Sequence, residues 1–171
     1  MLRRIIETRI AAAERKLGVP ADYMRHILKV SPPAFFKFLK ILPLSNYRRA
    51  VPPEPFHVAR LVATRDEDCG TCVQIEVNLA KQDGVSPVIL QAVLDRCPDD
   101  LPPALADVYH FAEEVVTASG AEGEFRERIR QLYGEEALVE LAMTLAACRV
   151  FPITKRALGY AQSCSKVTVR V

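Results

Sequence analysis

The stretch Leu138-Val-Glu-Leu-Ala-Met-Thr-Leu-Ala-Ala-Cys-Arg-Val150 is almost uniformly apolar and lies within a helix that the sequence predicts over residues 135–151. A helix that is apolar on every face has to be covered on every face, either by its own core or by another subunit. This stretch therefore predicts a protein built around packed helices.

The rest of the chain extends the same pattern outward from this segment. Apolar residues recur at spacings of three and four, which is the period of amphipathic helices. Further helices are expected over residues 2–17, 21–30, 34–42, 56–65, 69–82, 86–96, 105–118, 122–133 and 154–161. Residues 44–55 contain three prolines and should form an irregular connection. Strand alternation is convincing only in residues 167–171, which are too few to define a sheet, so the predicted fold class is all-α.

Charge divides the chain into two parts. Residues 1–50 contain 11 Lys or Arg against 3 Asp or Glu, which leaves 12 against 18 for residues 51–171. With 171 residues, half of them hydrophobic, the chain suits one well-cored domain, here a basic helical N-terminal arm followed by a helical body. The simpler account of the asymmetry is that the arm docks on the acidic body of the same or a neighbouring subunit. An anionic partner or a membrane surface is the alternative. No motif predicts nucleic-acid binding.

The cysteine count and the termini indicate the cellular setting. Five cysteines scattered through a chain of this length differ from the dense, even sets of small secreted proteins. The first residues lack a sustained apolar core and a cleavage site, and no uninterrupted apolar run reaches the roughly 18 residues that span a bilayer. A cytoplasmic protein that neither crosses nor binds a membrane is therefore expected.

The sequence Cys69-Gly-Thr-Cys72, followed by Glu76, is the place where residue chemistry departs from packing. A C-x-x-C pair stores two electrons as a disulfide, which predicts thiol redox activity. On a helix these three residues fall within about 60° of one another. Cys69, nearest the helix N-terminus, is expected to be the attacking thiolate, although the acidic residues 66–68 would raise its pKa.

Two further side chains are candidates for proton transfer. Glu76 lies one turn beyond Cys72 and could take a proton from its thiol. His57 lies on the preceding predicted helix. If the two helices fold back on one another, His57 is expected to face Glu76 and both sulfurs, which would place an acid/base pair beside a redox pair. No cofactor and no metal ion is expected.

This arrangement resembles the alkylhydroperoxidase D-like branch of the carboxymuconolactone decarboxylase family. The likeness rests on an ionisable residue 12 positions before C-x-x-C, another four positions after it, Gly84, the Ser86-Pro87 helix start and the segment 109–161. It covers residues 50–162 and leaves the arm unaccounted for. It implies an all-helical bundle that forms trimers or hexamers through its helices, a hydroperoxide or disulfide substrate, and reduction by a dithiol protein.

The chain departs from that family at one place. The family has Glu upstream and His downstream of the cysteines, whereas this chain has His57 and Glu76. The exchange would keep a carboxylate and an imidazole near the sulfurs but reverse the order of the proton path. The predicted function is thus a thiol-dependent peroxidase or disulfide oxidoreductase, with catalytic residues Cys69, Cys72, Glu76 and His57.

Other interpretations stay open at this point. The two cysteines could be packing residues, or could bind zinc with His57 and a carboxylate, although a second C-x-x-C or H-x-x-x-H is missing. A lyase acting on a lactone acid is the other activity of the resembled family, and it would leave the cysteine pair unexplained. A non-enzymatic assembly module is the third alternative. Cys97, Cys148, Cys164, His26 and His110 show no partner spacing and are interpreted as structural or without function.

Overall fold

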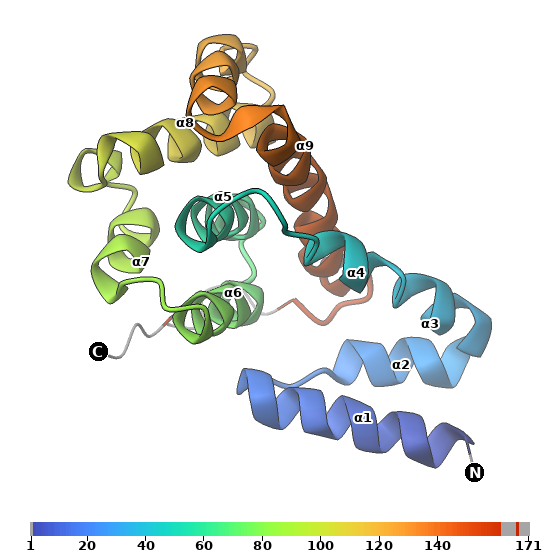
Figure 1. The fold of residues 1–171 in the computed structure, drawn as a ribbon. Coiled ribbons are helices and arrows are strands. Elements are labelled where there is room, and N and C mark those ends of the chain that lie inside the picture. The colour runs from blue at the N-terminus through green and yellow to red at the C-terminus, as the bar shows by residue number, and fades with distance from the viewer. Residues whose placement is uncertain (1, 162–166, 168–171) are drawn as a thin grey trace.

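The computed structural model describes residues 2–161 and residue 167, and the described residues fold as helices without a strand, which confirms the all-α class (Figure 1). The helices are α1 (Leu2–Leu17), α2 (Asp22–Val30), α3 (Pro32–Phe38), α4 (Ile41–Ser45), α5 (Pro53–Asp66), α6 (Gly70–Gln82), α7 (Pro87–Leu94), α8 (Pro103–Thr117) and α9 (Glu122–Ala157), with a 3-10 turn, η1, at Pro98–Asp100. Cys164 and most of the predicted strand 167–171 lie outside the described residues.

Helix ends follow the predicted signals where the local chemistry is strong. α1 stops at Gly18, which has a φ of +70° and whose N–H donates to the carbonyl of Glu14. Glycine adopts this left-handed conformation without the steric cost that a side chain brings. At the start of α7, the hydroxyl of Ser86 accepts the N–H of Val88, and Pro87 occupies the first helical position.

The predicted helix 34–42 is wrong in both its limits. The hydroxyl of Ser31 caps α3, which begins at Pro32 and ends at Phe38, and a separate helix α4 starts at Ile41. Pro43 does not end the helix but lies within its first turn. Because the N–H groups of a first turn have no intrahelical partner, proline loses no hydrogen bond there.

The three helices predicted between residues 122 and 161 are joined as α9. The first two meet at a kink where Gly134 has φ 88° and ψ 169°, a conformation that glycine permits. The third, expected over 154–161, is the end of α9 and stops at Ala157. Pro152 lies inside the helix, where it removes one backbone hydrogen bond, but the residue is buried and the helix continues past it.

The helix at the centre of the body is α5 and not the apolar stretch of α9. Figure 1 shows α6, α7, α8 and α9 arranged around α5, and α5 contacts all four. Every residue from Pro55 to Thr64 is buried. The expectation that residues 138–150 are covered on all sides is wrong for the single chain, because Val139, Ala142 and Ala146 lie exposed along one side of α9. A covering subunit stays a prediction.

The 36-residue helix α9 is long and apolar enough to cross a membrane by length and composition alone. Half of its most apolar window is buried inside the protein. The buried carboxylate of Glu140 and the side chain of Arg149, which pairs with Glu67, both interrupt that window. Core helices pass the same test, so this is weak evidence for a membrane span.

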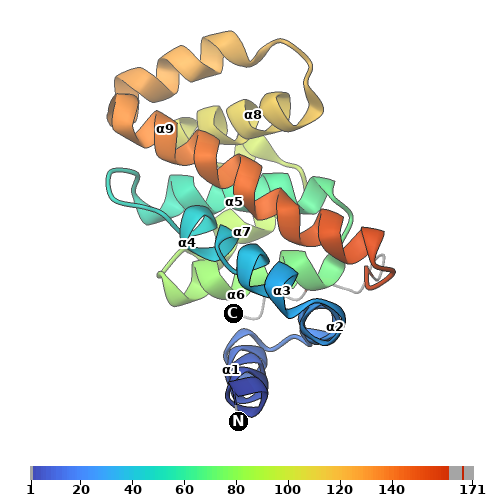
Figure 2. The ribbon, with the colours of Figure 1, turned by 90° about the vertical axis from the view of Figure 1, so that its right-hand side faces the viewer.

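Residues 1–50 form an arm with a small hydrophobic cluster of its own. Ile10, Leu28 and Phe35 are buried there, separate from the larger core that runs from Val51 to Cys148. Figure 2 shows α1 below the body, with α2, α3 and α4 leading from it along α9. The arm meets the body mainly through α4 on α9 and through the end of α1 on α6, where the amide of Asn78 donates to the carbonyl of Leu17.

Ion pairs account for little of this contact. Arg25 pairs with three carboxylates of the arm itself, those of Glu7, Glu14 and Asp22. Among the described residues, the pair between arm and body that the structure shows is Arg48 with Asp83, at 3.3 Å and partly exposed. Exposed pairs contribute little to stability, so apolar packing and backbone hydrogen bonds hold the arm in place.

One buried carboxylate fixes the connection between arm and body. The side chain of Glu140, on α9, accepts the backbone N–H groups of Arg49, Ala50 and Val51 at 2.8–3.1 Å. Burial alone would raise the pKa of Glu140, but these three donors outweigh it and hold the pKa below its ordinary value. The irregular segment predicted over 44–55 thus has a defined backbone path at its centre.

Replacing Glu140 with alanine should lower the free energy of unfolding by about 2 kcal/mol, because three backbone N–H groups lose their acceptor and one of them is buried. Urea denaturation measures this change. Glu136→Ala, at an exposed position of the same helix, is the control and should change stability by less than about 0.5 kcal/mol. Equal effects of the two substitutions would contradict the assignment.

The same carboxylate gives a pH dependence. Because its pKa is lowered in the folded protein, its stabilisation is complete above the ordinary value of 4.5 and is lost as the pH falls through the folded pKa. Wild type should therefore lose stability below pH 4.5 more steeply than Glu140→Gln, which has no proton to gain there.

Candidate functional site

The turn between α5 and α6 positions the two cysteines. α5 ends at Asp66, Asp68 turns the chain with a φ of +46°, and α6 begins at Gly70 with Cys69 as its N-cap residue. Cys72 follows one helical turn later. The sulfurs of Cys69 and Cys72 lie 2.9 Å apart, both cysteines are free thiols, and both are buried. The two sulfurs lie together as the spacing predicts, although Cys69 precedes the helix and does not lie on its face.

The first of the two thiols loses its proton easily, whereas the second is hard to deprotonate. A hydrogen bond joins the two sulfurs, and it lowers the pKa of Cys69 to about 5 against the opposing effect of burial. The same bond, together with burial, raises the pKa of Cys72. The pair therefore loses its first proton well below neutral pH and keeps the second proton between the sulfurs.

The sequence left open whether the acidic residues 66–68 would raise the pKa of Cys69. In the structure they do not outweigh the effects that lower it. Glu67, the buried one of the three, is bound by Arg149 at 2.6 Å and by Arg156 at 3.3 Å. These two guanidinium groups, both on α9, neutralise the carboxylate nearest the protein interior.

A buried lysine supplies positive charge beside the pair. Lys155, 5% exposed on α9, donates a hydrogen bond to the hydroxyl of Thr71, which lies 3.5 Å from the sulfur of Cys69. Its ammonium lies 5.5 Å from the centre of the Tyr23 ring. No ion pair among the described residues includes Lys155. Its positive charge lowers the pKa of Cys69 further, after the hydrogen bonds with Cys72 and Thr71, so the ammonium stabilises the thiolate.

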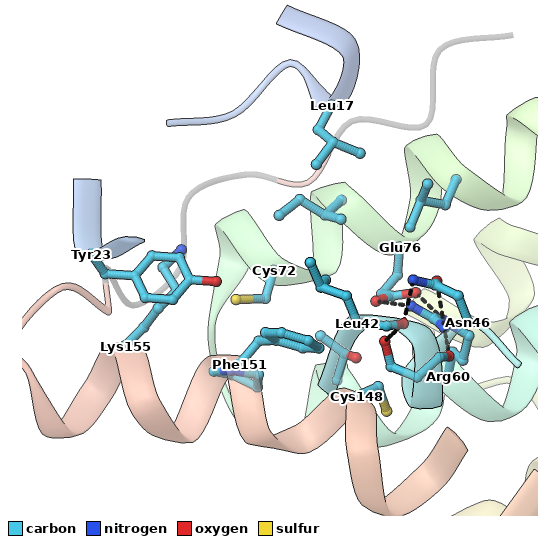
Figure 3. Close-up of a pocket in the computed structure, with 15 residues that line it drawn as sticks. Leu17, Tyr23, Leu42, Asn46, Arg60, Cys72, Glu76, Cys148, Phe151 and Lys155 are labelled. Carbon is cyan, nitrogen blue, oxygen red and sulfur yellow. Dashed lines mark hydrogen bonds and ion pairs between the residues drawn. The ribbon is translucent and has the colours of Figure 1, made fainter. Parts of the chain in front are cut away.

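Cys72 of the pair lines a cavity of about 190 Å³ that lies between the body and the arm (Figure 3). Cys72 and Glu76 enter it from α6, while Cys148, Phe151 and Lys155 enter from α9. The arm closes it with Leu17, Tyr23, Leu42, Ser45 and Asn46. The wall is mostly apolar, with its polar groups at the cysteine end and around Arg60. Cys69 does not line the cavity, so Cys72 is the sulfur that an occupant would meet.

Glu76 lies in the same cavity as Cys72 but is bound elsewhere. Arg60 donates to both of its oxygens, at 2.6 and 2.9 Å, and both side chains are buried. The same guanidinium donates to the carbonyl of Ser45 and to Asn46. Glu76 thus joins an ion pair that ties α5, α6 and the end of α4 together. The sequence expectation that it serves as a proton acceptor for Cys72 stays a prediction.

His57 does not face the sulfurs, so the expected meeting of imidazole, Glu76 and cysteines is wrong. Its Nε2 lies 2.9 Å from a carboxylate oxygen of Asp83, and it lines a separate surface hollow. Its Nδ1 has no hydrogen-bond partner among the described residues. Burial lowers the pKa of His57. Helices α5 and α6 do fold back on one another, but His57 lies beside the C-terminal end of α6. Arg60, one turn later on α5, is the residue that lies beside Glu76.

Sequence reasoning missed Arg60, Tyr23 and Lys155. A helical spacing signal was available for the last of these, because Cys148, Pro152 and Lys155 follow one another at intervals of four and three and share one face of α9. No local signal marks Tyr23, which reaches the site from the arm. The other cysteines differ in setting: Cys148 is buried at the cavity wall and Cys97 is exposed.

The zinc alternative required Cys69, Cys72, His57 and a carboxylate to converge. Within residues 2–161 and 167, no three His, Cys, Asp or Glu side chains form a group that could hold a metal ion. The position of His57 beside Asp83 accounts for this.

Comparison of the chain with protein-family models, with curated proteins and with solved structures found no match in any of the three. The function therefore has to be argued from the geometry and charge of the site itself.

Replacing Lys155 with methionine should raise the pKa of Cys69 above its value of about 5, because the thiolate loses a buried positive charge beside it. Absorbance of the thiolate at about 240 nm against pH, with alkylation rates as a second measure, reports the shift. Lys37→Met removes the same charge from an exposed position of the arm and should leave the titration unchanged. An unchanged titration in Lys155→Met would show that the cysteine hydrogen bond alone sets the pKa.

Replacing Glu76 with alanine should lower the free energy of unfolding by about 3–5 kcal/mol, because Arg60 would remain buried without its anion. Denaturant unfolding measures the loss. The double variant Arg60→Met/Glu76→Leu is the matched control and should recover most of it, since no charge is left buried. A stable Glu76→Ala protein with impaired thiol chemistry would instead support the proton-transfer role.

Proposed function

We propose that this protein is a thiol-dependent peroxidase that reduces a small organic hydroperoxide with the Cys69–Cys72 pair. The observation that carries the proposal is the position of the two reduced sulfurs, 2.9 Å apart, with Cys72 at the wall of a mostly apolar cavity. The lowered pKa of Cys69 provides the pair with a thiolate at neutral pH, and the thiolate is the nucleophilic form of cysteine. The likeness to the alkylhydroperoxidase D-like branch in residues 50–162 supports the same activity.

The pair divides two tasks between its members. Cys69 carries the negative charge in the resting pair, whereas Cys72 faces the cavity. A proton shift across the 2.9 Å between the sulfurs converts Cys72 to the thiolate. Cys72 then attacks the terminal oxygen of the hydroperoxide, the S–O bond forms, the O–O bond breaks, and Cys72 becomes a sulfenic acid.

Cys69 completes the cycle. Its sulfur attacks the sulfenic acid of Cys72, the S–S bond forms, and the hydroxide that leaves takes the proton of Cys69 to give water. In sum, the pair with its one proton, a hydroperoxide and one further proton give a disulfide, an alcohol and water. A dithiol protein then reduces the disulfide by thiol exchange. This order of attack differs from the sequence-based expectation that Cys69 attacks first, because only Cys72 lines the cavity.

The size of the cavity favours a small substrate. An engineered apolar cavity of about 150 Å³ admits benzene, so a cavity of about 190 Å³ suits a molecule of similar or slightly larger volume. A small hydroperoxide such as tert-butyl hydroperoxide is therefore the favoured probe. Assembly as a trimer or hexamer and a cytoplasmic location belong to the same proposal.

The lyase and assembly alternatives have less support. A lactone acid would need a free cation to bind its carboxylate, but the guanidinium of Arg60 is bound to Glu76, Ser45 and Asn46, and the ammonium of Lys155 donates to Thr71 and stabilises the Cys69 thiolate. A purely structural module would leave two buried thiols with one lowered pKa unexplained. Neither alternative uses the cysteine pair.

Reduced protein should consume tert-butyl hydroperoxide with formation of a Cys69–Cys72 disulfide, and Cys69→Ser and Cys72→Ser should each lower turnover at least about 100-fold, because one sulfur attacks and the other resolves. Peroxide loss and peptide mapping of the disulfide are the measurements. Cys97→Ser, at an exposed thiol, is the control and should retain activity. Full turnover in both pair variants would reject the function.

The order of attack has its own measurement within this experiment. In Cys69→Ser, oxidation should stop at a Cys72 sulfenic acid, which a dimedone-type reagent traps. Trapping at Cys69 in the Cys72→Ser variant, at the wild-type rate, would instead assign the attack to Cys69.

A further inference from the structure

The N-terminal arm brings a phenol to the reactive end of the cavity. Tyr23, on α2, lines the cavity together with Cys72, and Figure 3 shows its hydroxyl directed toward the Cys72 sulfur. Two contacts orient the ring: Phe38 meets it edge-on at 6.1 Å, and the ammonium of Lys155 lies 5.5 Å from its centre. The hydroxyl makes no hydrogen bond to another described residue.

The two cations that line the cavity have partners of their own. Lys155 donates to Thr71, and Arg60 donates to Glu76 and to the end of α4. Among the described residues that line the cavity, the hydroxyls of Tyr23 and Thr64 make no hydrogen bond, and it is the Tyr23 hydroxyl, from the arm, that is directed toward the Cys72 sulfur. Burial, with the negative charge of the two cysteines, raises the pKa of Tyr23, so the phenol keeps its proton throughout the neutral range.

Peroxide cleavage needs such a donor. When a thiolate attacks R–O–O–H, the oxygen attached to R leaves with the electron pair of the broken O–O bond. An alkoxide is a strong base, so protonation as it leaves lowers the barrier. Neither Glu76, paired with Arg60, nor His57, bound to Asp83, is placed to supply that proton.

We propose that Tyr23 is a catalytic residue that donates its phenolic proton to the leaving oxygen of the hydroperoxide, so that the N-terminal arm completes the active site. This inference rests on the proposed peroxidase function. Cys72 forms the S–O bond, the O–O bond breaks, and the alkoxide takes the Tyr23 proton to become an alcohol. The phenolate regains a proton from solvent through a second surface hollow, which Tyr23 lines together with Thr71 and Tyr160.

The test compares two oxidants whose leaving groups differ in basicity. tert-Butyl hydroperoxide releases a strongly basic alkoxide, whereas peracetic acid releases acetate, which needs no proton to leave. Tyr23→Phe keeps the ring and removes only the hydroxyl. Its rate of cysteine oxidation by tert-butyl hydroperoxide, followed in single turnover, should fall about 100-fold, while its rate with peracetic acid should change by less than about threefold.

The matched control is Tyr160→Phe, which removes a hydroxyl from the same surface hollow but outside the cavity. It should react with both oxidants at wild-type rates. Equal slowing of both oxidants in Tyr23→Phe would overturn the proton-donor role in favour of an effect on the thiolate or on cavity shape, and unchanged rates would also overturn it. If wild type reacts with neither oxidant, the peroxidase function itself fails, an outcome distinct from the other two.

Discussion

The buried ion pair between Arg60 and Glu76 is the constraint on which the rest of this structure depends. Both side chains are almost completely excluded from solvent, and their hydrogen bonds are 2.6 and 2.9 Å long. Burial opposes the charged form of each, so the two groups have to stay together. Since Arg60 belongs to the central helix α5 and Glu76 to α6, the pair fixes the rotation of α6 about its own axis.

That rotation decides which other residues of α6 face inward. Cys72 lies one turn before Glu76 and therefore enters the same cavity. Arg60 also reaches the carbonyl of Ser45, which brings the last helix of the arm against the body. One guanidinium group thus links the helix that carries the sulfurs, the central helix and the arm that covers the cavity.

The arm acts as a wall of the site as well as a neighbour of the body. Its own hydrophobic cluster is small, and it is joined to the body by Glu140 and by packing on α9 and α6. Its residues form one wall of a cavity whose other walls come from α5, α6 and α9. Burial of the cysteines and Lys155 strengthens their interactions, because charges interact more strongly where the dielectric constant is low.

The sequence by itself determined the all-α class, most helix limits and the proximity of Cys69 and Cys72, because these follow from helical periodicity and from local capping and breaking residues. From their hydrophobicity, residues 138–150 were predicted to be buried on all sides. In the tertiary structure the helix buried on all sides is α5. Burial depends on how many helices surround a segment, and α5 is surrounded although it contains His57, Arg60 and Thr64.

Only the tertiary structure decided which side chains meet at the site. It paired Glu76 with Arg60, placed His57 beside Asp83, and brought Tyr23 and Lys155 to the cavity. The hydrogen bonds of Glu76, His57 and Lys155 join residues that are 16, 26 and 84 positions apart, and no local pattern encodes which of several ionisable side chains will meet across two packed helices.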